Sequence, residues 1–69
     1  MTTIKWKETA IVSMRNEEED WTEQIENGET FDIEKIELIS EDSENGDVVE
    51  IYNEDVVITA NSQWFEIQK

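Results

Sequence analysis

The chain has 69 residues and no cysteine, histidine or proline, and 19 acidic residues against five basic ones give it a formal net charge of −14. Without cysteine or histidine it can form neither a disulfide nor a thiolate nucleophile, and it lacks the commonest zinc ligand, while a surface of this charge repels nucleic acid and anionic membranes. No apolar run approaches the roughly 20 residues that span a bilayer and no signal-peptide pattern is present, so we expect a single cytoplasmic domain over residues 1–69.

Two short segments near the start alternate apolar and polar residues. Ile4 and Trp6 alternate with lysines, which predicts a short first strand or the beginning of one. Ala10, Val12 and Met14 share one parity, so we expect a second segment of strand with these side chains pointing inward.

The acid-rich segment at 17–26 allows two interpretations. Asn16 can cap a helix with Glu19 in the capping-box position, and Trp21 and Ile25 lie four residues apart, so that they would share one helix face. Only these two apolar residues would anchor such a helix, and a helix of about ten residues is marginal without packing. One short helix and an irregular acidic loop both remain open.

The longest extended candidate runs from Gly28 to Ser40. Its apolar residues form two pairs of opposite parity: Phe31 with Ile33, and Ile36 with Leu38. An unbroken strand would place the two pairs on opposite faces of the sheet. A bulge or bend near residues 34–35, or a sheet covered on both faces, would bring both pairs inside. A bent strand that serves two sheets is one way in which a small barrel closes.

The C-terminal half predicts two hairpins and a closing strand. Asn45-Gly46 is a strong hairpin signal, because both central positions of a type I′ turn require positive φ. Residues 48–52 and 56–60 alternate in the manner of strands, with a tight turn at Asn53-Glu54 between them. A connector or single helical turn follows, and residues 65–67 form a last short strand.

The core is predicted from the apolar parity of these segments. We expect it to contain Ile11 or its neighbours Ala10 and Val12, together with Ile25, Phe31, Ile33, Ile36, Leu38, Val49, Ile51, Val56, Ile58 and Phe65. Trp6 and Trp64 are expected to be mostly structural, because so short a chain needs its large apolar groups inside. Trp21, which is set among acids, is the candidate for an exposed binding residue.

This order of elements resembles the Src-homology-3-like (SH3-like) barrel, a family also common among small bacterial and bacteriophage proteins. Residues 10–14 lie where the family has its first motif strand, residues 25–29 look like its diverging turn, and residues 60–67 look like its 3₁₀ turn and final strand. The resemblance implies a mainly β fold, a small antiparallel barrel of five to six strands. Val12 and Met14 replace aromatics of the family's polyproline groove, so polyproline binding is not expected.

The acidic surface is the functional clue. No catalytic or cofactor motif is present, and residues 42–47 lack the spacing of a calcium loop, so we expect neither an enzyme nor a cofactor or metal site. Solubility alone is one interpretation of the charge. The other is mimicry, in which carboxylates on a rigid domain occupy a groove built for phosphates.

We expect a monomer or small homo-oligomer that binds a protein partner with a basic surface. It would act as an inhibitor, of the kind that bacteriophages encode, by imitating nucleic-acid charge and blocking a nucleic-acid-binding host protein. The alternative is a small SH3-like adaptor or assembly module that binds protein through its barrel and Trp residues. The expected partner-binding residues are Glu17, Glu18, Glu19, Asp20, Trp21, Glu23, Asp42, Glu44 and Asp47.

Overall fold

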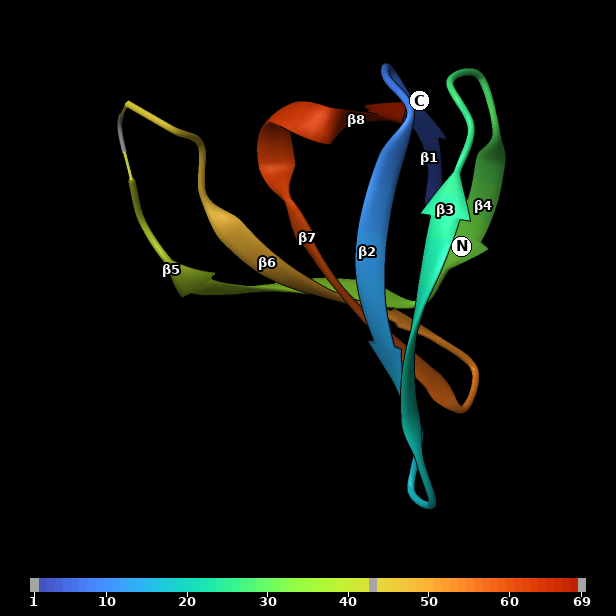
Figure 1. Cartoon of the computed structure of the whole chain (residues 1–69). Coiled ribbons are helices and arrows are strands. Elements are labelled where there is room, and N and C mark those ends of the chain that lie inside the picture. Colours follow the sequence, from blue (N-terminus) through green and yellow to red (C-terminus); the bar gives the residue numbers. More distant parts are fainter. Residues whose placement is uncertain (1, 43, 69) are drawn as a thin grey trace.

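The computed structural model describes residues 2–42 and 44–68, and it is built almost entirely of antiparallel strands (Figure 1). The elements are β1 (Thr2–Trp6), β2 (Ala10–Arg15), β3 (Asp20–Ile25), β4 (Thr30–Ile33), β5 (Lys35–Ser40), β6 (Val48–Asn53), β7 (Val56–Asn61), the 3₁₀ turn η1 (Ser62–Trp64) and β8 (Phe65–Gln68). They form a three-stranded sheet in the order β4-β1-β8 and a five-stranded sheet in the order β3-β2-β7-β6-β5. The predicted mainly β, antiparallel fold is therefore confirmed, with more strands than expected and without closure of the sheets into a barrel.

Neither of the two structures considered for 17–26 is found, because the segment is not a helix and, after a turn, it forms the regular strand β3 instead of an irregular loop. The spacing of four between Trp21 and Ile25 also fits the even period of a strand, so it could not separate a helix from a strand. The side chain of Asn16 makes the cap-like contacts but uses them to close a turn. Its Oδ1 accepts from the backbone N–H groups of Glu18 at 2.8 Å and Glu19 at 2.9 Å.

The bend predicted in the central segment is confirmed. β4 ends at Ile33 and β5 begins at Lys35, and the two strands belong to different sheets. The backbone N–H of Glu34, between them, donates to the carbonyl of Tyr52 on β6 at 2.8 Å, which ties the bend to the larger sheet. One continuous segment thus connects the two layers that enclose the core.

The core lies between the two sheets. Its buried apolar residues are Ile4, Trp6, Val12, Met14, Ile25, Ile33, Val49, Ile51, Ile58, Ala60 and Phe65. Phe31, Ile36 and Val56 are partly buried and pack against this cluster. Of the alternatives at the start of β2, Val12 is buried and Ile11 is 65% exposed, which fits the prediction of Ile11 or its neighbours. Leu38 was predicted to lie in the core, and this is wrong, since it is 53% exposed.

The exposure of Ile11 and of Leu38 each has a physical reason. Ile11 has the opposite parity to its buried neighbour Val12, so its side chain lies on the outer face of β2. Leu38 lies opposite the buried Val49 and has the inward parity. However, the end of β5 extends away from β1 and β8, so the smaller sheet does not cover it (Figure 1).

Trp6 is the largest fully buried side chain in the core. Its ring meets those of Phe31 and Phe65 edge-on, with centroids 5.9 Å and 5.4 Å away. Its indole Nε1 is buried and has no hydrogen-bond partner among the described residues. The packing of three aromatic rings from β1, β4 and β8 therefore outweighs the loss of one hydrogen bond at this position.

The loop at 41–47 differs in type from the predicted hairpin turn. β5 and β6 do form a hairpin, and Gly46 has φ +89°, but Asn45 lacks the positive φ that a type I′ turn requires. Asp42 organises the loop, since its Oδ1 accepts from the backbone N–H of Asn45 at 3.0 Å and its carbonyl accepts from that of Gly46 at 3.0 Å. The side chain of Asn61 packs directly over Gly46, which leaves no space there for a Cβ atom.

Candidate functional site

The carboxylates lie at the surface with few partners. None of the 19 acidic residues is buried, and Asp47 and Glu50 alone are half-buried. In residues 2–42 and 44–68 there are two ion pairs, Arg15 with Glu50 at 2.6 Å and Lys35 with Glu37 at 2.9 Å. The remaining acidic side chains therefore have no cation at ion-pairing distance within this part of the chain.

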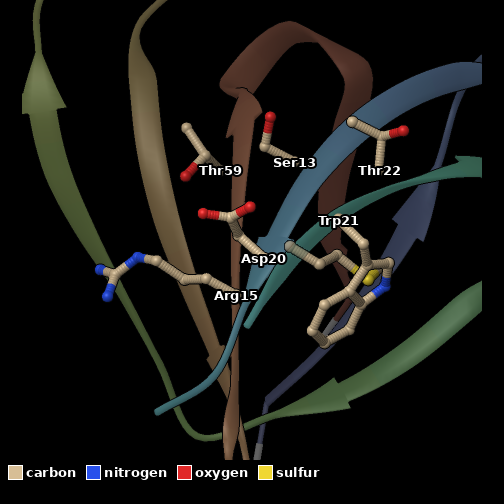
Figure 2. A pocket seen from close by; sticks show the side chains of 7 residues that line it. Ser13, Arg15, Asp20, Trp21, Thr22 and Thr59 are labelled. Atoms are coloured by element: carbon tan, nitrogen blue, oxygen red, sulfur yellow. The ribbon is translucent and has the colours of Figure 1, made fainter. Parts of the chain in front are cut away.

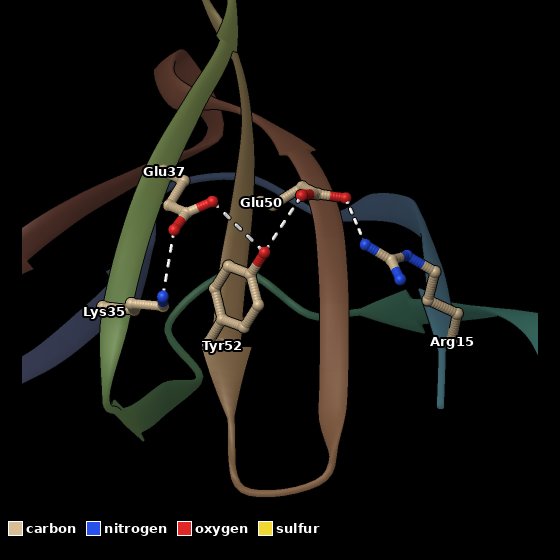
Figure 3. Close-up of polar contacts among 5 residues, drawn as sticks. All are labelled: Arg15, Lys35, Glu37, Glu50 and Tyr52. Atoms are coloured by element: carbon tan, nitrogen blue, oxygen red, sulfur yellow. Dashed lines mark hydrogen bonds and ion pairs between the residues drawn. The ribbon is translucent and has the colours of Figure 1, made fainter. Parts of the chain in front are cut away.

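Both of these ion pairs belong to one network on the outer face of the larger sheet (Figure 3). The hydroxyl of Tyr52 contacts Glu50 at 3.2 Å and Glu37 at 3.3 Å, and the Lys35 ammonium lies 4.6 Å from the centre of the Tyr52 ring. The hydrogen bond and charge of Lys35 lower the pKa of Glu37. Burial and then the hydrogen bond to Glu50 raise the pKa of Tyr52. The network neutralises its own charges, so the negative field arises elsewhere.

One source of that field is the end of the molecule where two hairpins turn side by side (Figure 1). Arg15, at the end of β2, pairs with Val57 near the start of β7, so the β2–β3 turn lies beside the β6–β7 turn. The side chains of Glu17, Glu18 and Asp55 line a shared recess there, and Glu54 lines an adjoining one. We call Glu17, Glu18, Glu54 and Asp55 the acidic tip.

Sequence reasoning found only half of the acidic tip. Glu17 and Glu18 were among the predicted partner-binding residues, whereas Glu54 and Asp55 were not. The tight turn between β6 and β7 was predicted, and Glu54 in that turn has φ +55°. The pairing of β2 with β7 was not predicted, and it is this pairing that brings the two turns together.

The predicted residues Asp20, Trp21 and Glu23 lie on β3, an end strand of the larger sheet. Asp20 and Glu23 are exposed. Trp21 lies opposite Met14 and is half-buried against the core rather than fully exposed, so part of the indole remains at the surface. Glu19 is exposed and precedes this strand, in the turn that Asn16 closes.

The predicted residues Asp42, Glu44 and Asp47 lie in the loop between β5 and β6, at the other end of β6 from the acidic tip (Figure 1). Two of these carboxylates bind their own loop. Hydrogen bonds from Asn45 and from the backbone of Glu44 lower the pKa of Asp42, and the Asp47 Oδ1 accepts from the backbone N–H of Asp42 at 3.1 Å. The structure therefore separates the two predicted groups of acids instead of joining them.

A recess of about 310 Å³ lies beside β3 (Figure 2). Thr22, Ser13 and Thr59 stand in one row across β3, β2 and β7, and their short side chains form its floor. Arg15 and Asp20 bound it. Because the Arg15 guanidinium is engaged with Glu50, the Asp20 carboxylate beside the recess is without a cation among the described residues. The recess can therefore accommodate a polar or cationic group from outside.

Three further findings concern the chain as a whole. Among the described residues, no group of three or more potential ligands is arranged to hold a metal ion. None of their helical segments is both apolar enough and long enough to cross a membrane. No protein-family model, curated protein or solved structure matches this chain.

Proposed function

We propose that this chain binds a basic protein and blocks its nucleic-acid-binding surface by presenting carboxylates in place of phosphates. The observation that carries the proposal is the exposure of the acids together with their lack of cationic partners within the described residues. Unpaired surface carboxylates steer a basic partner at long range and repel nucleic acid itself. The backbone of the short turns that join paired strands needs no ordering on binding, which favours affinity.

The acidic tip and β3 are the surface that we assign to the partner. The acidic tip places two hairpin turns with their carboxylates at one end of the sheet, and β3 continues from it with Asp20 and Glu23. Trp21 adds apolar area at its margin. Charge provides fast association in such a surface, and the aromatic contributes to slow release.

The proposal also includes a fold family and a cellular location for the protein. An open variant of the SH3-like barrel is favoured by the order of the C-terminal elements, in which η1 lies between β7 and the closing strand β8. We place the protein in the cytoplasm, where nucleic-acid-binding targets are found, as an inhibitor of the type that bacteriophages encode.

The test is capture from a bacterial lysate on the immobilised chain, followed by elution with increasing salt. We expect basic nucleic-acid-binding proteins that elute with salt and are displaced by duplex DNA, because counterions screen such contacts. A partner that stays bound at high salt and is not displaced by duplex DNA would contradict mimicry.

A matched pair of variants localises the contact. Reversal of Glu17, Glu18 and Asp55 to Lys makes the acidic tip net positive, whereas reversal of Glu8, Glu41 and Glu66 to Lys makes the same change in net charge at other exposed positions. We expect the first variant to lose at least about tenfold more affinity than the second. Equal losses would show that total charge, and not this surface, decides binding.

The adaptor remains the second candidate, and one observation favours it. Leu38 and Ile39 are 53% and 54% exposed near the end of β5, where they form apolar surface that charge mimicry does not need. Binding there would depend weakly on salt. Replacing both residues with Ser would abolish capture by an adaptor and leave capture by a charge mimic unchanged.

A further inference from the structure

The two end strands of the larger sheet differ in what can pair with them. β3 and β5 each have six residues and, within the described chain, a partner strand on one side only. The ladder of β5 with β6 shifts register between Leu38 and Ser40. Such an irregularity twists an edge and discourages further pairing. β3 keeps one register with β2 through six pairs, from Ala10–Ile25 to Arg15–Asp20, so β3 is the regular edge.

The charge on β3 determines which strand can join it. Asp20 and Glu23 are exposed and have no cationic partner among the described residues, and Glu19 comes directly before the strand. A second copy of this chain would bring acids opposite acids, in addition to the repulsion between two molecules of net charge −14. A segment that carries Lys or Arg would instead form opposite-charge pairs across the strands. Charge complementarity therefore selects a basic segment.

The side chains on either face of β3 define the pattern of that segment. Successive residues of an added strand would point alternately to the two faces of the sheet. On the outer face, the recess beside Asp20 and Thr22 has a volume of about 310 Å³, which suits a long cationic side chain (Figure 2). On the inner face, the exposed part of Trp21 offers apolar contact, and the exposed Glu23, which has the same parity, lies two residues further along the strand. The complementary sequence thus alternates basic residues for the outer face with residues for the inner face, of which the one beside Trp21 is apolar.

We propose that β3 binds an extended basic segment of the protein partner as an added sixth strand of the five-stranded sheet. Main-chain hydrogen bonds to the free edge hold the segment, and Asp20 with the recess selects its cationic side chains. The inference rests on the proposed function for the basic character of the partner, and it adds the mode of recognition.

The first experiment compares two synthetic peptides that carry the same number of lysines, one alternating lysine with valine and the other alternating lysine with proline. Proline has no N–H and cannot complete a strand ladder. We expect the lysine–valine peptide to slow amide hydrogen exchange in residues 20–25 and to bind at least about tenfold more tightly. Equal binding of the two peptides overturns strand addition but leaves capture by charge intact. Slowed exchange in residues 35–40 instead overturns the choice of edge, and no binding of either peptide at low salt contradicts both proposals.

The second experiment uses variants of matched charge with the lysine–valine peptide as probe. Asp20→Lys with Glu23→Lys alters the edge, whereas Glu44→Lys with Glu66→Lys makes the same change in net charge at exposed positions away from β3. We expect the first pair to weaken binding at least about tenfold more than the second. Equal weakening by the two pairs would overturn the assignment to β3.

Discussion

Arg15 on β2 bonds to Glu50 on β6, with 2.6 Å between Nη2 and Oε2, although β7 lies between these two strands. The guanidinium therefore reaches across β7 and away from Asp20, which lies opposite Arg15 in the β2–β3 register on the other side of β2. The Glu50 side chain is 19% exposed and also receives the hydroxyl of Tyr52. A half-buried carboxylate thus receives two donors, while Asp20 remains available at the edge.

We expect Arg15 and Glu50 to be energetically coupled. Arg15→Gln should lower the melting temperature more than Lys35→Gln, because Glu50 would remain half-buried without its cation, whereas Glu37 is well exposed. A double-mutant cycle with Glu50→Gln, measured by thermal unfolding, should show losses that do not add. Additive losses would mean that the pair contributes nothing beyond its separate side chains.

Truncation to Ala should destabilise the protein strongly at Trp6 and very little at Ile11. Trp6→Ala removes the fully buried ring at the centre of the core and should cost about 3–5 kcal/mol, enough to unfold a small domain. Ile11→Ala, at an outer-face position, should change stability by about 0.5 kcal/mol or less. Urea unfolding checks both. A large loss from Ile11→Ala would mean that the outer face of β2 is covered.

The two glycines with positive φ should differ in their tolerance of alanine. Gly28 has φ +95° and open space around it, so Gly28→Ala should cost only backbone strain, about 1–3 kcal/mol. Gly46 has φ +89°, and a Cβ atom would also collide with Asn61 and Gln63. Gly46→Ala should therefore be the more destabilising variant in the same unfolding assay. A greater loss of stability from Gly28→Ala than from Gly46→Ala would show that the side chains around Gly46 can move aside at little cost.

Asp42 should make stability depend on pH in the acid range. Its hydrogen bonds to Asn45 and Glu44 lower its pKa in the folded state below the ordinary value of 3.8. The folded state then holds the charged form more strongly than the unfolded state, so the stabilisation is fully present above the ordinary value and is lost as pH falls through the lowered one. The difference in stability between the unmodified protein and Asp42→Asn should therefore shrink below pH 3.8, the ordinary pKa. A constant difference down to the lowest pH would mean that ionisation of Asp42 does not hold the loop.

Alternation of apolar residues predicted much of the fold, because in a strand with one buried face apolar residues recur at every second position. The bend near Glu34 followed from a change of parity, and η1 and β8 fell where they were expected. The segment containing Trp21 was ambiguous, because a spacing of four residues suits a helix and a strand alike. Exposure of Leu38 could not be predicted, since it depends on how far the smaller sheet extends over β5.

The candidate site was less predictable than the fold. High acid density identified Glu17 and Glu18, but Asp55 joins them only because β2 pairs with β7, a contact between distant segments. The density of acids in the sequence also could not distinguish free carboxylates from those that accept hydrogen bonds from their own loop. Asp42 lies in an acid-rich segment, as Glu17 and Glu18 do, yet its Oδ1 accepts hydrogen bonds from the backbone N–H groups of Glu44 and Asn45 in its own loop.

The three-stranded sheet draws its strands from the start, the middle and the end of the described chain, and β1 at its centre pairs with both β4 and β8. Contacts such as that of Thr3 with Gln68 require closure of a loop almost as long as the chain itself. The five-stranded sheet is built mainly from neighbouring hairpins, which close short loops. Folding should therefore be slow for so small a domain, with the hairpins forming first and the β1–β8 contact limiting the rate.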